Sequence, residues 1–337
     1  MKGFFDIRVR ILKYTGEKME KILRYIKKEL SAPVLLICFC LMISAFLSVS
    51  TESFYSFKNV VNILEANSYR MILAVGMMCV ITSGAIDLSV GSILSFSAIC
   101  TAISLKAELP IALCILLGLL SGTVMGGING ALVYVTRINP LIITLATSYM
   151  YRGLSLMVTE GIPVTKLPES FREIGCGDIF GMESGVTAAF VIIIAMIPVF
   201  FFMKWGSYIA SLGGNPEALK RCGVKTWKYR ISVFALMGFL ASVSGIIVSA
   251  RLNSAEANAG LNMEMDAICA VIMGGTALHG GKGSLFGTVI AVFLMGLIRN
   301  GLTIMSVSSY YQQFITGAML LCAVVIAELR ERRARIG

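Results

Sequence analysis

Long apolar stretches, separated by short polar turns, recur along the 337-residue chain and restrict what it can fold into. A helix that crosses the hydrocarbon core of a bilayer, about 30 Å thick, needs roughly 20 apolar residues. Apolar residues make up 57% of this sequence and charged residues 14%, whereas about 25% of a soluble domain is charged. The chain is therefore expected to be an integral membrane protein. We expect ten membrane spans, at residues 32–50, 69–84, 88–105, 110–135, 138–158, 185–203, 231–250, 265–278, 285–304 and 310–327.

These spans favour helices over a β-barrel, because the alternation of apolar and polar residues typical of barrel strands is absent. The predicted fold is an all-α, polytopic transmembrane helical bundle of about ten spans, of which 69–84 and 265–278 are short. Residues 31–328 form one transmembrane domain in this interpretation. The segment 1–30 is too charged for a signal peptide and predicts an amphipathic surface helix, and residues 329–337 form a basic tail.

Basic residues are distributed unevenly between the two predicted sides of the membrane. With ten spans, 21 Lys and Arg residues fall on one side and six on the other. Because cytoplasmic loops retain Lys and Arg, we assign the basic side, including both termini, to the cytoplasm. The long outer loop 159–184 carries five acidic residues instead. The net charge of +10 reflects this asymmetry and suits anionic inner-leaflet lipid, so we discard a nucleic-acid partner.

The longest inner insert, residues 204–230, carries signals for a short capped helix. Asn215 is able to accept a bond from the first free N–H groups, and Pro216 suits the first turn. Glu217 would face the positive end of the helix dipole, and Gly223 would end the helix. We therefore predict about two turns of cytoplasmic helix.

No metal site is expected. The single His279 has no Cys or carboxylate at ligand spacing, which makes it a turn residue. Eight of the nine cysteines lie in or beside spans or on the inner side, so we expect packing residues rather than an extracellular disulfide.

The glycine-rich run 276–283 has some likeness to a phosphate-binding loop. Its first position is Thr276 instead of Gly, and Gly283 follows Lys282 where Ser or Thr is required. No strand precedes the run, and no hydroxyl group follows the Lys to hold Mg²⁺. We therefore expect no ATP binding and no cofactor on this chain.

Two glycine-rich segments interrupt the helical pattern and are our candidates for the pathway through the bundle, since irregular backbone at membrane depth is tolerated where it lines a cavity. They contain Gly84, Asp87, Ser89, Gly91 and Ser92 in the first and Gly274, Gly275, Thr276, Gly280 and Gly281 in the second. Asp87 has two interpretations, a polar group at the inner mouth or a helix N-cap. Snorkelling toward the outer surface is sufficient to explain Arg152 and Arg299.

Four ordered blocks of sequence resemble a known family, the permease subunits of ABC importers for ribose, xylose, galactose and related sugars. The blocks are Gly84-Ala85-Ile86-Asp87-Leu88-Ser89-Val90-Gly91-Ser92, Leu212-Gly213-Gly214-Asn215-Pro216-Glu217-Ala218, Met273-Gly274-Gly275-Thr276 with Gly280-Gly281-Lys282-Gly283, and Val307-Ser308-Ser309-Tyr310-Tyr311-Gln312. The insert also resembles the wider coupling motif of Glu-Ala-Ala, three residues and Gly, as Glu217-Ala218-Leu219 with Gly223. Leu219 replaces the second Ala of that motif.

The resemblance implies a non-enzymatic permease subunit in the bacterial cytoplasmic (inner) membrane. Two such subunits, a homodimer or a heterodimer of close relatives, form the pathway. A cytoplasmic ABC ATPase binds ATP and Mg²⁺, and an extracytoplasmic protein delivers the sugar. The short helix of the insert would couple the ATPase to the bundle.

Two alternatives remain at this stage. The same architecture could import a non-sugar compound, such as a furanosyl signalling molecule. An ion-coupled secondary transporter would need buried carboxylates near the midplane, but Asp87 and Asp266 fall at span edges, which disfavours this class.

Overall fold

A computed structural model describes residues 33–51, 54–179 and 181–336, and this part of the chain is mainly helical. The predicted amphipathic segment 1–30 lies outside the described residues. The helices are Pro33–Ser50, α2 (Phe57–Thr82), α3 (Val90–Lys106), α4 (Ile111–Thr136), α5 (Pro140–Thr159), α6 (Glu169–Cys176), α7 (Ser184–Phe201), α8 (Lys204–Gly214), α9 (Pro216–Arg221), α10 (Thr226–Leu252), α11 (Met263–Met273), α12 (Leu285–Ile304) and α13 (Ser309–Ile336).

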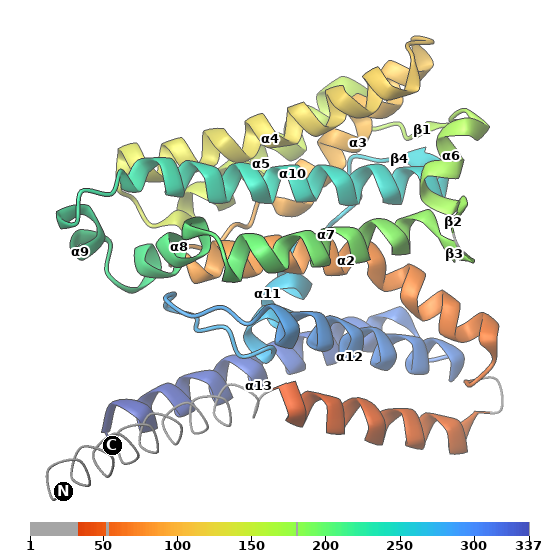
Figure 1. Cartoon of the computed structure of the whole chain (residues 1–337). Coiled ribbons are helices and arrows are strands. Elements are labelled where there is room, and N and C mark those ends of the chain that lie inside the picture. The colour runs from red at the N-terminus through yellow and green to blue at the C-terminus, as the bar shows by residue number, and fades with distance from the viewer. Residues whose placement is uncertain (1–32, 52–53, 180, 337) are drawn as a thin grey trace, which may run out of the picture.

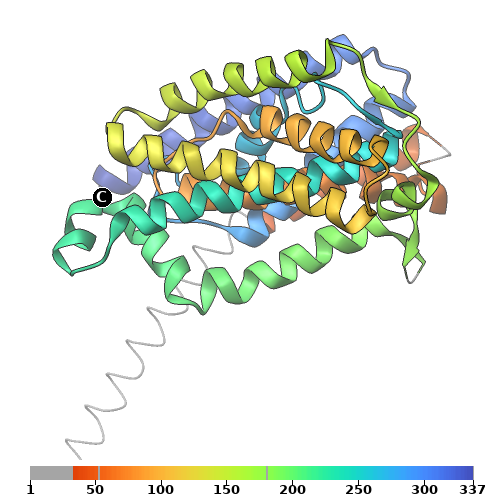
Figure 2. The same ribbon diagram turned by 90° about the horizontal axis from the view of Figure 1, so that it is seen from above.

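Helices α2 and α10 form the centre of the bundle. In their most apolar stretches, 78% and 67% of the residues are buried, against 28% in α4, α5 and α7 and 6% in α13. The peripheral helices therefore present broad apolar faces to their surroundings. Figure 2 shows α5 and α7 on opposite sides of the bundle.

Small residues allow α4 and α10 to pack closely. A Cβ added at Gly122 would lie 2.0 Å from the Ser242 Oγ, and one at Gly126 would lie 2.2 Å from the Phe234 carbonyl oxygen. Ser97 of α3 shares a 3.0 Å hydrogen bond with Ser242. Such contacts are typical of membrane bundles, where lipid tails are as apolar as the helices and close packing supplies the attraction.

The two ends of the bundle differ (Figure 1). Helices α8 and α9 and the C-terminal end of α13 lie at one end. At the other end lie α6 and two small antiparallel pairs, β1 (Val164–Thr165) with β4 (Ser254–Ala255), and β2 (Asp178–Ile179) with β3 (Met182–Glu183). The shared end of the insert and the C-terminal helix agrees with the predicted topology, so we use "inner" for that end and "outer" for the end with α6.

Each of the ten predicted spans coincides with a helix, and eight of these helices in the described chain are long and apolar enough to cross a membrane. The all-α bundle is confirmed. The prediction that the second span is short is wrong, because α2 has 26 residues and starts at Phe57. Its first half carries polar side chains such as Asn59 and Glu65, which are buried against other helices and lower the local hydropathy. Among the helices that coincide with predicted spans, the two shortest are α3, with 17 residues, and α11, with 11.

Candidate functional site

The inner insert folds into the helix pair α8 and α9 and leads directly into α10. Asn215 caps α9 through its side chain, which accepts a 2.9 Å hydrogen bond from the Ala218 backbone N–H. Pro216 occupies the first turn together with Glu217. Gly223 has φ +79°, and its backbone N–H donates to the Lys220 carbonyl. The predicted capped helix is present, with six residues between its caps.

One face of α9 is anchored and the other is free for a partner. Leu219 is buried, while Ala218, Lys220 and Arg221 are exposed. Leu219 is the residue that departs from the wider coupling motif, and its side chain fixes the short helix to the bundle through apolar burial. The structure therefore offers α9 as a firmly seated, basic projection at the inner end.

In the first glycine-rich segment, residues 84–89 are irregular chain between α2 and α3, whereas Gly91 and Ser92 lie in the first turn of α3. Asp87 is fully buried, and its Oδ1 accepts bonds from the Ser89 backbone N–H (2.9 Å) and the Ser89 hydroxyl (2.6 Å). The N-cap of α3 is Ser89. Asp87 thus stabilises the turn before the helix and is not itself the N-cap. Within the described chain, its Oδ2 has no hydrogen-bond partner.

Two neighbouring helices hold this buried turn in place. Asn129 of α4 donates through Nδ2 to the Ser89 Oγ at 2.7 Å, and its Oδ1 accepts a 3.0 Å bond from the Tyr151 hydroxyl of α5. Ser92, in the first turn of α3, donates to the Ser89 carbonyl at 2.7 Å. Neither Asn129 nor Tyr151 belongs to the two glycine-rich segments from which the pathway candidates were chosen.

The second glycine-rich segment, 274–284, joins α11 to α12 with three glycines in the left-handed region: Gly275 (φ +93°), Gly280 (φ +85°) and Gly281 (φ +86°). Thr276 is buried, and its Oγ1 accepts a 3.1 Å bond from the Ser284 backbone N–H. A Cβ at Gly274 would lie 2.4 Å from the Thr288 backbone nitrogen. The segment is therefore a compact loop packed against the start of α12.

Three segments that are far apart in sequence meet by backbone contact at the inner end, and we call this contact the glycine joint: residues 82–84, 213–214 and 280–281. The Gly281 N–H donates to the Thr82 carbonyl at 2.9 Å. A Cβ at Gly213 would lie 2.1 Å from that carbonyl oxygen and 2.9 Å from the Gly84 nitrogen. A Cβ at Gly280 would lie 2.7 Å from the same nitrogen. The last turn of α8 therefore touches both glycine-rich segments.

A hydrogen bond from α10 adds to the contacts of the glycine joint, and a cavity lies beside the joint. Arg230, at the start of α10, donates from Nη1 to the Ser83 carbonyl at 3.0 Å. A cavity of about 620 Å³ lies between α9 and the turn from α4 to α5, with Arg137, Lys220 and Arg230 in its walls and Glu217 opposite in charge. The end of α8 and the start of α10, which flank α9, therefore both contact residues 82–84.

The first segment also meets a loop that descends from the outer end. A Cβ at Gly91 would lie 2.2 Å from the Gly260 carbonyl oxygen. Gly260 precedes α11, so the N-terminal ends of α3 and α11 lie close to each other inside the bundle. The glycine-rich breaks are thus part of one connected region that extends from the glycine joint toward the interior.

The snorkelling interpretation of two arginines is wrong. Arg152 donates from Nη1 to the carbonyls of Ala257 and Ala259 and to the Ser95 hydroxyl, so it ties α5 to the descending loop. Arg299 forms an ion pair with Asp266 of α11. Both side chains find partners inside the bundle, which removes the need to reach the surface.

No group of three or more potential metal ligands occurs in the described part of the chain. All nine cysteines are free thiols. The glycine-rich run 276–283 is packed on Gly84 and Gly213, and its Gly281 N–H is already bonded to Thr82. Backbone N–H groups of this kind would have to point freely at a phosphate to bind it.

Comparison with known proteins decides the family. Residues 59–324 match the family described as the permease component of branched-chain amino acid transport systems. The chain belongs to this permease family. The match includes the insert, both glycine-rich segments and the central helices.

Curated relatives of this permease cover most of its length. The ribose import permease protein of Haemophilus influenzae is 38% identical over 85% of this chain and 90% of its own. The D-allose transport system permease protein of Escherichia coli is 34% identical (86% and 89%), and the L-arabinose ABC transporter permease protein of Azospirillum brasilense is 30% identical (88% and 87%). No solved structure matches the permease. The family membership and the apolar helices together show that this permease is a multi-pass protein of the bacterial inner membrane.

Proposed function

We propose that this permease is the membrane-spanning subunit of an ATP-driven importer whose cargo is a monosaccharide. The support for the cargo class is the similarity, across nearly the whole chain, to permeases named for ribose, D-allose and L-arabinose. The family description refers to branched-chain amino acids, so an amino-acid cargo is the second candidate.

The proposed mechanism rests on the backbone contacts of the glycine joint. ATP hydrolysis by a partner would move the exposed face of α9, and the joint would transmit this motion to residues 82–84 and 280–281. Packed interfaces of this kind have discrete arrangements, so a small displacement at one end can shift the balance between inward-open and outward-open states. The permease itself would supply the pathway and no catalytic group.

The proposal assigns ATP and Mg²⁺ to a separate ABC ATPase on the inner side and sugar delivery to an extracytoplasmic binding protein. The pathway would form between two permease subunits, either identical or closely related. The exposed apolar faces of α5, α7 and α13 would contact lipid or the second subunit, because large apolar surfaces of membrane bundles are covered in these two ways.

ATP-driven uptake into proteoliposomes tests this function. Vesicles would contain the permease, its ATPase and its binding protein, and the cargo would be labelled D-ribose, D-allose, L-arabinose or leucine. We expect uptake of at least one sugar that requires all three components. Sugar uptake without the ATPase would refute the ATP-driven mechanism, and uptake of leucine alone would identify an amino-acid permease.

A further inference from the structure

We propose that a polar cavity between α2, α12 and α13 is a binding subsite for a neutral polyhydroxyl compound that enters from the outer end. The cavity has a volume of about 380 Å³, within the range of about 300–1,000 Å³ found for small-molecule sites. Its walls include Asn67, Arg70, Arg299, Asn300, Thr303 and Gln312. These residues come from the outer halves of α2 and α12 and the first turn of α13.

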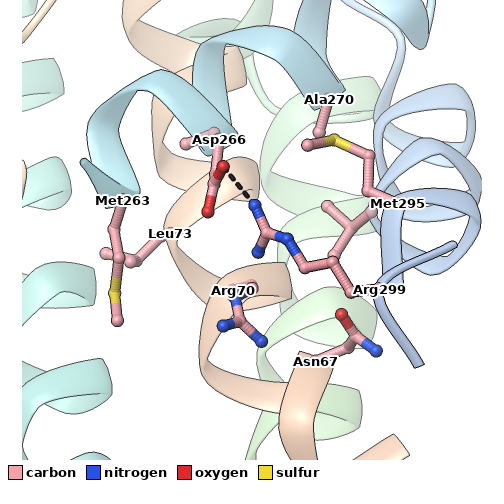
Figure 3. A pocket seen from close by; sticks show the side chains of 10 residues that line it. Asn67, Arg70, Leu73, Met263, Asp266, Ala270, Met295 and Arg299 are labelled. Atoms are coloured by element: carbon pink, nitrogen blue, oxygen red, sulfur yellow. Dashed lines mark hydrogen bonds and ion pairs between the residues drawn. The ribbon is translucent and has the colours of Figure 1, made fainter. Parts of the chain in front are cut away.

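Three arginines line the cavity, and two of them form ion pairs. Arg251 pairs with Glu65 at 3.1 Å, and Arg299 pairs with Asp266. Arg70 has no carboxylate partner in the described chain, and its Nη1 donates to the carbonyl of Ala66 within its own helix. Figure 3 shows Arg70 beside the Asp266–Arg299 pair, with Asn67 close by, at the inner extension of the cavity.

Two buried polar atoms at this inner extension have unused hydrogen-bonding capacity. Asn67 is 2% exposed, its Nδ2 donates to the Ile63 carbonyl at 2.6 Å, and its Oδ1 has no partner in the described chain. The Arg70 Nε is likewise buried without an acceptor. Buried polar groups are normally hydrogen-bonded, and each unmet one is destabilising, so the pair indicates a ligand that supplies both partners.

Hydroxyl groups offer both kinds of partner, because a hydroxyl donates its hydrogen, as the Asn67 Oδ1 requires, and accepts on its oxygen, as the Arg70 Nε–H requires. A small anion without a hydrogen-bond donor would pair with Arg70 but leave the Asn67 oxygen without a donor. A compound with several neighbouring hydroxyls meets both needs, and the exposed amide of Asn62 and the half-buried amide of Gln312 lie in the same cavity wall.

The subsite rests on the proposed function only for the identity of the polyhydroxyl compound. Monosaccharides are the polyhydroxyl compounds that a binding protein would release at this outer end. The site would then be a receiving position above the pathway, with weak affinity suited to onward transfer.

Protection of an introduced thiol tests the subsite. Thr303 is exposed at the cavity wall, so we would examine Thr303→Cys in the full-length permease, with the six cysteines that are not buried replaced by Ser. A membrane-impermeant thiol reagent would be added with D-ribose, D-allose, L-arabinose, inorganic phosphate or betaine as osmotic control. We expect at least one sugar to slow labelling several-fold, while phosphate and betaine leave the rate unchanged. Ser170→Cys, on the exposed surface of α6, should be labelled at the same rate in every solution.

A matched pair of glycine variants checks that protection arises in this cavity. A Cβ at Gly296 would lie 2.0 Å from the Asn67 Nδ2 and 2.4 Å from its Oδ1, so Gly296→Ala must displace that side chain. Gly317→Ala meets nothing within 4 Å. Protection should be lost in the first variant and kept in the second.

Several outcomes would overturn the subsite. These are protection by no sugar, protection by phosphate alone, equal slowing at Ser170→Cys, or full protection in Gly296→Ala. The assay contains no ATPase and no binding protein, so it separates the two proposals. Uptake without protection would remove only the subsite, and protection without uptake would remove only the importer function.

Discussion

Gly213→Ala should disconnect the inner insert from the two glycine-rich segments. The added Cβ would lie 2.1 Å from the Thr82 carbonyl oxygen, 2.7 Å from the Gly281 nitrogen and 2.9 Å from the Gly84 nitrogen. All three are backbone atoms, so no flexible side chain can move aside. The segments must separate, and the 2.9 Å hydrogen bond from Gly281 to Thr82 would be stretched or lost.

The expected cost follows from these contacts. Overpacking costs about 1–3 kcal/mol, and loss of one hydrogen bond adds roughly 0.5–1.5 kcal/mol. The closed joint should therefore be destabilised by about 2–4 kcal/mol, and each 1.4 kcal/mol corresponds to about a tenfold change in an equilibrium constant. Gly214→Ala is a matched control, because its nearest atom is the Gly281 Cα at 3.9 Å. Both variants gain the same helix preference of Ala over Gly.

The effect of Gly213→Ala on coupling is measured as sugar uptake per ATP hydrolysed, in proteoliposomes that contain the complete transporter. Gly213→Ala should be inserted normally but show a lower ratio and a lower melting temperature, while Gly214→Ala should match the parent protein. Equal ratios in the two variants would refute the idea that the glycine joint transmits motion.

Three other substitutions test separate features. Asn129→Leu removes the buried hydrogen bonds to Ser89 and from Tyr151, so the melting temperature should fall, with a cost of about 1–3 kcal/mol. Gly223→Val should be less stable than Gly223→Asn, because a branched residue is strained in the left-handed region by about 1–2 kcal/mol and Asn tolerates it; equal melting would contradict this. Burial, and then the Glu65 carboxylate, raise the pKa of Glu183 above 4.5, so its protonated form favours folding and stability should fall as pH rises from 4.5 through the raised pKa. Glu183→Gln should flatten that dependence and melt higher at neutral pH; an unchanged pH profile would contradict the assignment.

Local sequence signals predicted much of the inner end. Asn215, Pro216 and Gly223 act through their own backbone neighbourhoods, so their types and spacing were sufficient to place α9. The glycine-rich breaks were found for the same reason, since glycines interrupt helix periodicity wherever they occur. The ten apolar stretches likewise predicted the helices that coincide with them, apart from the start of α2, whereas α6 and α8 were not predicted.

Contacts between distant segments could not be predicted in this way. The approach of Gly213 to Gly84 and Gly281 joins positions more than 60 residues apart, and nothing in the local sequence indicates which glycines will meet. Arg152 and Arg299 were misinterpreted because their partners, two carbonyls of a descending loop and Asp266, are brought near only by the packed bundle. The polar cavity was missed because Asn67 lies in the outer half of α2, which was not assigned to a span.

In the proposed mechanism, the work of a separate ATPase enters this permease through α9. Photo-cross-linking tests it most directly, with a photoreactive amino acid at Arg221, on the exposed inner helix, or at Ser170, on the opposite end. In membranes that contain the complete transporter, the probe at position 221 should cross-link to the ATPase subunit, and the probe at position 170 should not. Cross-linking of the ATPase at position 170, with none at position 221, would contradict the account.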